Sequence, residues 1–174
     1  PRTGIEEVNH NTPSAHLLAY APVNVMSFDL QTYLKERKTL IDSAMDRYLP
    51  SEAEQPSVVH EAMRYSTLDG GKRLRPILTL ASCEAVGGQI EMAMPAACAI
   101  ECIHAFSLIH DDLPCMDNDD FRRGRPTVHK VYGEAMALLA GDALFAFAFQ
   151  LMSRVSSDIP SSTVLRVWQQ IADA

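Results

Sequence analysis

The sequence lacks the alternation of apolar and polar residues that builds β-strands, and it contains no internal repeat. Four cysteines in 174 residues are too few for a disulfide framework, which favours a reduced, intracellular protein. Lys and Arg number 15 against 22 Asp and Glu, so the formal net charge is −7 and we expect no nucleic-acid partner. What remains is a globular composition, with 47% hydrophobic and 21% charged residues.

Targeting and membrane signals are weak. Residues 1–25 hold no apolar run flanked by basic residues, so they do not resemble a secretory signal, and they make a poor transit peptide. We expect residues 1–26 to be a poorly structured extension. The one membrane candidate is 135–152, where Asp142 would cost about 2.5–3.5 kcal/mol in a bilayer. A buried helix is the better interpretation, and we do not expect an integral membrane protein.

Apolar residues recur at three- and four-residue spacing over most of the chain, which predicts an all-α fold. Proline and paired glycines supply the expected helix ends, and Ser161 to Thr163 are expected to cap the last helix. The expected helices cover residues 27–49, 57–67, 74–86, 91–113, 128–155 and 161–174, with a charged loop over 117–126.

A basic cluster opens the third expected helix. It reads Gly70-Gly71-Lys72-Arg73-Leu74-Arg75-Pro76. The positive end of a helix dipole, free N–H groups and three cations together favour a multiply charged anion. A P-loop is excluded because Arg73 stands where Ser or Thr should follow the lysine. A solvated helix start is the alternative interpretation of this cluster.

An acidic cluster ends the fourth expected helix, with Asp111, Asp112 and Asp117 in His110-Asp111-Asp112-Leu113-Pro114-Cys115-Met116-Asp117. Adjacent carboxylates repel one another unless a cation lies between them, and hard oxygen ligands suit Mg²⁺. In an unbroken helix Asp117 would point about 120° away from Asp111, so the helix must break near Pro114 for both to reach one metal. An EF-hand is excluded because Arg122 stands where the loop needs glycine, while an exposed acidic turn remains possible.

A third cluster, Phe121-Arg122-Arg123-Gly124-Arg125-Pro126, follows within a few residues. These arginines either neutralise the carboxylates or grip phosphate oxygens beside them. A metal-bound diphosphate would satisfy all three clusters.

These three clusters, with Glu61 to Ser66, His104 and Leu139 to Leu144, resemble the short-chain trans-isoprenyl diphosphate synthases, especially plant and cyanobacterial geranylgeranyl diphosphate synthases. The resemblance covers about residues 27–174. It implies an all-helical bundle around a deep apolar cavity, usually a homodimer, and the cytoplasm or a plant or algal plastid as location. A Cys-x-x-x-Cys pattern such as Cys98 and Cys102 is associated with pairing of subunits in plant relatives. Two small buried hydrophobes are the alternative.

The resemblance also implies roles for individual residues. Lys72, Arg75 and His104 would hold the diphosphate of isopentenyl diphosphate, and Arg123 would contact the same group. Asp111, Asp112 and Asp117 would bind Mg²⁺ with the allylic diphosphate, and Arg122 would contact that allylic diphosphate. The residues that help form the cavity floor and set product length would be Phe106 and Ser107. An aromatic at 106 resembles farnesyl-forming bacterial relatives, but the rest of the chain favours the C20 product.

Other functions account for fewer of these residues. A metal phosphohydrolase built on His110 and Asp111 leaves the basic clusters unexplained, and a terpene cyclase has no use for Lys72 and Arg75. A non-catalytic partner subunit of an active synthase is the serious alternative. The family's second Asp-rich motif has no counterpart in these residues, and the final helix pattern stops without a cap. We therefore expect the N-terminal portion of a synthase domain over 27–174, inactive or weak alone.

Overall fold

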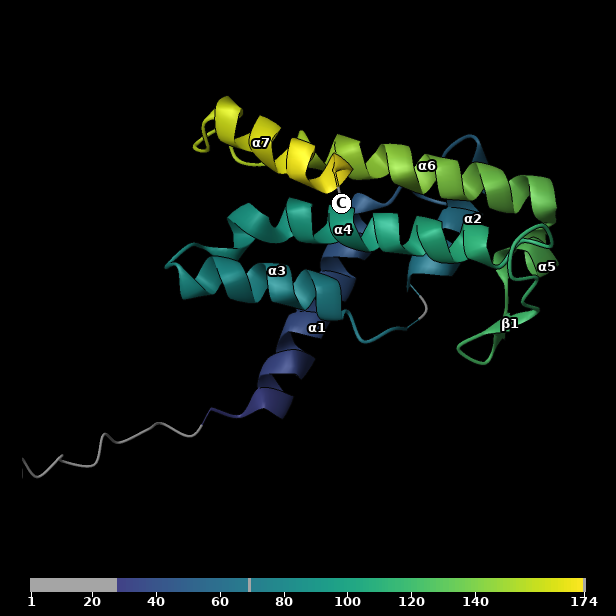
Figure 1. Ribbon diagram of the computed structural model, residues 1–174, viewed down its shortest axis with the longest axis horizontal. Coiled ribbons are helices and arrows are strands. Elements are labelled where there is room, and N and C mark those ends of the chain that lie inside the picture. Colours follow the sequence, from purple (N-terminus) through teal and green to yellow (C-terminus); the bar gives the residue numbers. More distant parts are fainter. Residues whose placement is uncertain (1–27, 69, 174) are drawn as a thin grey trace, which may run out of the picture.

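Two apolar helices, α4 (Ile90–Asp111) and α6 (Glu134–Met152), lie side by side at the centre of the structure (Figure 1). The protein is seen here as a computed structural model that describes residues 28–68 and 70–173. Gly141 allows the close approach of the two helices, because a Cβ atom there would lie 2.3 Å from Nε2 of His110. The buried side chains form one apolar core around this pair.

The remaining helices pack around the central pair. They are α1 (Leu30–Tyr48), α2 (Ser57–Leu68), α3 (Leu74–Ala85), the short α5 (Val128–Tyr132) and α7 (Ser161–Ala172). Asp29 caps α1 by accepting hydrogen bonds from the backbone N–H groups of Gln31 and Thr32 at 3.0 and 3.2 Å. In Figure 1, α3 and α7 flank α4, so the three helices enclose a common space that the functional site uses.

The all-α prediction is confirmed, and three local expectations are wrong. The helix expected over 128–155 is divided at Gly133, whose φ of 85° no helix can contain. A hairpin of two-residue strands, β1 (Phe121–Arg122) and β2 (Arg125–Pro126), stands within the expected loop. The serine cap of α7 is also wrong, since Pro160 occupies that position without a side-chain hydrogen bond.

Both central helices are long and apolar enough to cross a membrane, whereas the sequence pattern pointed to α6 alone. They pack on each other in the core, and core helices share this composition, so the signal is weak. Asp142 is largely exposed, with its carboxylate 3.9 Å from Nε2 of His110. Cys98 and Cys102 are fully buried on α4, as expected for two small core hydrophobes, and all four cysteines are free thiols.

Candidate functional site

The acidic cluster lies where α4 ends and the chain turns back on itself. The backbone N–H of Asp117 donates to the carbonyl of Asp111 at 2.8 Å, and that of Asn118 donates to Leu113 at 3.1 Å. Asn118 takes the left-handed conformation, with φ of 56°, that this reversal requires. The helix therefore breaks after Asp111, as the spacing of the carboxylates demanded, and residues 111 and 117 become neighbours.

Asp112 differs from the other two predicted carboxylates because it is buried and paired. The Arg122 guanidinium grips it through Nε, 2.9 Å from both carboxylate oxygens, and through Nη2, 2.6 Å from Oδ1. This hydrogen bonding raises the pKa of Arg122. Arg122 thus neutralises Asp112, which was one of the two possibilities that the sequence left open.

Asp111 and Asp117 remain available for a ligand. Within residues 28–68 and 70–173, neither carboxylate forms a hydrogen bond or an ion pair. The same part of the chain contains no group of three His, Cys, Asp or Glu side chains that could hold a metal by themselves. Two free carboxylates nevertheless fit Mg²⁺, which takes one or two of them and completes its shell with water and phosphate oxygens.

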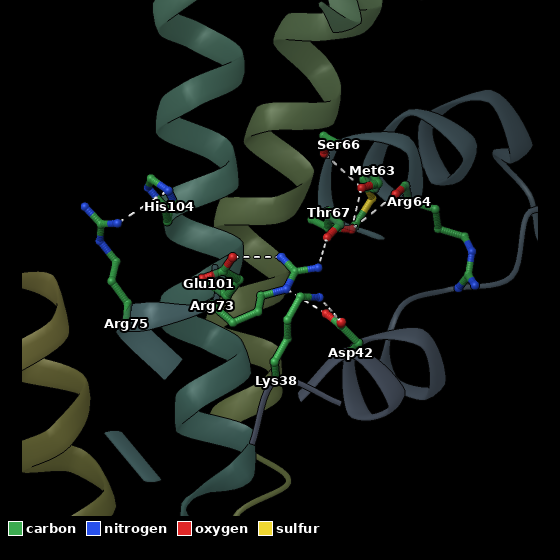
Figure 2. A network of polar contacts seen from close by, with 10 residues as sticks. All are labelled: Lys38, Asp42, Met63, Arg64, Ser66, Thr67, Arg73, Arg75, Glu101 and His104. Carbon is green, nitrogen blue, oxygen red and sulfur yellow. Dashed lines mark hydrogen bonds and ion pairs between the residues drawn. The ribbon is translucent and has the colours of Figure 1, made fainter. Parts of the chain in front are cut away.

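The predicted diphosphate ligands meet in one cavity of about 540 Å³. Lys72 and Arg75 reach it from the start of α3, His104 from the middle of α4, and Arg123 from the hairpin turn. Nη1 of Arg75 lies 3.4 Å from Nε2 of His104, as Figure 2 shows. We name this cavity the basic pocket, after the side chains of Lys72, Arg75, His104 and Arg123.

Arg123 enters the basic pocket across Gly71. A Cβ atom at residue 71 would lie 2.5 Å from Nη1 of Arg123, so any other residue would force the guanidinium to move from this position. The φ of 95° at Gly71 is a second reason for glycine. The loop before α3 and the hairpin are thereby brought into contact.

The surroundings of His104 favour its neutral form. Burial lowers the pKa of the His104 imidazole, and the positive charges of Arg75, Arg123 and Arg122 lower it further against a weaker opposing effect of Glu101. The basic pocket therefore carries a positive field that favours an anion of several charges.

Arg73 does not face this pocket as a free cation, which corrects the expectation of three cations presented to an anion. Its side chain is 2% exposed, with Nε 2.7 Å from Oδ1 of Asp42 and Nη1 2.7 Å from Oε1 of Glu101. Nη2 donates to the carbonyl of Thr67 (Figure 2). Burial acts to lower the pKa of Arg73, but the hydrogen bonds to Glu101 and Asp42 raise it overall.

Sequence reasoning missed Glu101 and Asp42. Glu101 did leave a signal, because it is the single charged residue within 92–103 of an otherwise apolar helix. A buried charge of this kind calls for a partner. Asp42 sits among ordinary surface charges of α1 and left no such signal.

An apolar groove of about 830 Å³ adjoins the basic pocket and shares Arg75 and His104 with it. Ser107 lines this groove, with Ile103 of α4 and Val167 of α7. The groove is the counterpart of the apolar cavity that the sequence led us to expect.

Phe106 packs elsewhere. Its ring centroid lies 4.6 Å from that of His110 and 5.1 Å from that of Phe145 on α6. Phe106 is therefore adjacent in sequence to Ser107, which lines the groove, but does not line the groove itself. Its role in product length stays a prediction.

Comparison with known proteins agrees with this geometry. Residues 56–173 match the family model described as polyprenyl synthetase, so the chain belongs to the polyprenyl synthetase family. The heterodimeric geranylgeranyl pyrophosphate synthase large subunit 1, chloroplastic, of Arabidopsis thaliana is 56% identical over 150 residues, which are 85% of this chain and 40% of that protein. A geranylgeranyl diphosphate synthase of Cyanophora paradoxa is 50% identical over 146 residues, covering 84% of this chain and 48% of that protein.

Solved structures extend the likeness to the fold. An FPP/GFPP synthase from Zymomonas mobilis superposes with a TM-score of 0.76 and 44% identity, over 82% of this chain and 51% of that one. The geranylgeranyl pyrophosphate synthetase from Pyrococcus horikoshii gives 0.74 and 46% identity, over 82% of this chain and 42% of that one. The chain therefore spans about 40 to 50% of the length of these relatives.

Proposed function

We propose that this chain belongs to a trans-prenyltransferase that condenses isopentenyl diphosphate with an allylic diphosphate to give geranylgeranyl diphosphate. The observation that carries the proposal is the convergence of Lys72, Arg75, His104 and Arg123 on one pocket, from three separate segments of the chain. Four such groups suit a diphosphate better than a single phosphate, because their charges can spread over several oxygens.

Mg²⁺ is the proposed cofactor, and Asp111 and Asp117 would hold it. Their unpaired carboxylates, on two residues whose backbones are hydrogen-bonded at the end of α4, are the support for this assignment. When bound, the metal supplies positive charge that stabilises the diphosphate leaving group. Asp112 would act indirectly, since its pairing with Arg122 fixes the hairpin that carries Arg123.

The chain's own residues would then divide the work. Lys72, Arg75 and Arg123 bind and orient isopentenyl diphosphate, whose double bond attacks the cation formed when the allylic C–O bond ionises. A proton is then lost from the condensed chain. The apolar groove receives the growing hydrocarbon and excludes water that would quench the cation.

Binding of isopentenyl diphosphate to the protein, measured by calorimetry, tests the site. Lys72→Ala and Arg75→Ala should each weaken binding by about tenfold or more, because a hydrogen bond to a charged group contributes roughly 1.5–3 kcal/mol. The matched control is Lys35→Ala, which removes an exposed lysine of α1 outside the pocket. Equal affinity in all variants would contradict the proposed site.

A partner subunit is the second candidate function, favoured by the word "heterodimeric" in the name of the Arabidopsis relative. We propose a homodimer, or a heteromer with a related subunit, and a plastid or cytoplasmic location, given the chloroplastic relatives. Incubation with labelled isopentenyl diphosphate, an allylic diphosphate and Mg²⁺, with and without a related synthase, separates the two functions. No product from this chain by itself, together with a rate in the mixture above that of the synthase by itself, would support the partner role.

Product length has its own test. If Phe106 forms part of the cavity floor, Phe106→Ala should shift the products toward longer chains, which chromatography of the dephosphorylated alcohols would detect. Ile103→Ala, one turn away on the groove wall, serves as the comparison. An unchanged product distribution would remove Phe106 from the floor.

A further inference from the structure

The buried contacts of Arg73 join four segments at a single side chain. Its guanidinium binds Asp42 of α1, the carbonyl of Thr67 at the end of α2 and Glu101 of α4, while its backbone begins α3 (Figure 2). All three donating nitrogens are used, and the side chain is 2% exposed. We call Arg73, Asp42 and Glu101 the arginine clamp.

The backbone at Arg73 explains why the side chain points inward. Residue 73 has φ of 52° and ψ of 32°, a left-handed conformation that is costly for a residue with a Cβ atom. This reverses the side-chain direction relative to its neighbours, so that Lys72 and Arg75 stay exposed while Arg73 is buried. The cost is tolerated only because the surrounding contacts hold the residue there.

The clamp connects the two halves of the basic pocket. Arg73 lies between Lys72 and Arg75 in the loop that enters α3, and Glu101 precedes His104 by one turn of α4. Two of the three clamp residues, Arg73 and Glu101, also line the pocket. Because Asp42 and Glu101 neutralise Arg73, the clamp sets geometry while Lys72, Arg75 and Arg123 supply the charge.

We propose that Arg73 is a positioning residue, which holds Lys72 and the first turn of α3, with Arg75, against α4 so that both meet His104 around one diphosphate. This inference rests on the proposed function. It assigns no contact between Arg73 and the substrate. Lysine at position 73 keeps the charge, but its three donors share one nitrogen atom and cannot span partners that the guanidinium reaches from three nitrogen atoms. It should therefore preserve much of the fold and loosen the pocket.

The test compares Arg73→Lys with Arg37→Lys. Arg37 is a matched control because it also joins two helices, pairing with Glu84 between α1 and α3, away from the pocket. Inorganic pyrophosphate is the probe, its affinity is measured by calorimetry, and thermal unfolding is followed for each variant. Arg73→Lys should weaken pyrophosphate binding by about 10- to 100-fold, since loss of one hydrogen bond to a charged ligand has an effect of this size, whereas Arg37→Lys should leave it unchanged.

The NMR signal of the His104 ring provides a readout that general destabilisation would not move. It should shift in Arg73→Lys without ligand, because the contact between Arg75 and His104 changes, and it should stay in place in Arg37→Lys. Should Arg73→Lys fail to fold, Glu101→Gln is the second variant, because it keeps a hydrogen-bond acceptor for Arg73 and removes the charge.

The outcomes separate the two proposals. Wild-type affinity in Arg73→Lys or Glu101→Gln would overturn the positioning role, and so would equal losses in Arg73→Lys and Arg37→Lys. Absence of pyrophosphate binding by the unsubstituted protein would overturn the diphosphate site itself and this inference with it.

Discussion

At the scale of single residues, the structure assigns different work to cations that look equivalent in the sequence. Arg73 is buried in the clamp, Arg122 neutralises Asp112, and Arg123 crosses Gly71 into the basic pocket. Residue type alone could not separate these roles, because each depends on the direction of a side chain set by backbone conformation.

The position of Gly71 leads to a prediction for which a substitution at Gly70 is the control. Alanine at either Gly70 or Gly71 should lower the free energy of unfolding by about 1–2 kcal/mol, since both have φ near +90°. Only Gly71→Ala should weaken pyrophosphate binding, because the new methyl group displaces Arg123, whereas a Cβ at Gly70 meets nothing within 4 Å. Denaturant unfolding and calorimetry measure the two effects, and equal binding by both variants would refute the role of Arg123.

His104 gives a prediction about pH. Burial and the nearby arginines lower its pKa below the ordinary 6.5 in the free protein. A bound diphosphate brings negative charge and raises that pKa, so binding takes up a proton in the interval between the two values. Affinity for pyrophosphate should therefore increase as pH falls through this interval, beyond the effect of the ligand's own titration.

The control for this pH dependence is His104→Gln, which keeps hydrogen-bonding groups and cannot titrate. Proton uptake is obtained from calorimetry in buffers of different ionisation enthalpy. If wild-type and His104→Gln proteins take up the same number of protons, the imidazole plays no part.

At the scale of elements, the packing of α4 on α6 depends on residue 141 being glycine, which has no side chain. Gly141→Ala would place a methyl group 2.3 Å from Nε2 and 2.6 Å from Cδ2 of His110, so the helices must separate or the ring must move. Overpacking of this kind costs about 1–3 kcal/mol, which denaturant unfolding would detect. The double variant Gly141→Ala, His110→Ala should lose less than the sum of the single changes, and full additivity would contradict a direct clash.

Helices α1 to α4 could be predicted from the sequence to within a few residues, because apolar spacing and Pro or Gly ends specify them locally. The break at Gly133 could not, since glycine is tolerated within helices and only the φ of 85° reveals the end. The hairpin escaped for another reason, as two-residue strands are too short to alternate.

The site was predictable to a similar degree. Motif residues far apart in the chain meet in the basic pocket, as the resemblance implied. The pairing of Asp42 with Arg73, in contrast, could be found only from the structure. The pairing of Asp112 with Arg122 was one of two open possibilities and is present in the structure, while the contact of Arg122 with an allylic diphosphate stays a prediction.

At the scale of the whole molecule, the four thiols report on the integrity of the core. Cys115 is exposed and should react rapidly with a thiol reagent, and Cys83 should react more slowly. Burial raises the pKa of Cys98 to about 12 and raises that of Cys102 as well, so the reactive thiolate is scarce in both. Absorbance titration should count two reactive thiols in the folded protein and four in denaturant.

Cys115→Ser is the control, because it should remove the rapid phase alone. Immediate reaction of all four thiols in native buffer would mean that α4 is not buried as described.

Ionic strength should have two separate effects on this molecule, because some of its charges are buried and others are exposed. The ion pair of Arg73 with Glu101 is buried, so mobile ions hardly reach it. Lys72, Arg75 and Arg123 are exposed, within a Debye length of about 8 Å of bulk electrolyte at physiological salt. Added salt should thus weaken ligand binding gradually, while the buried contacts of the arginine clamp keep the shape of the pocket.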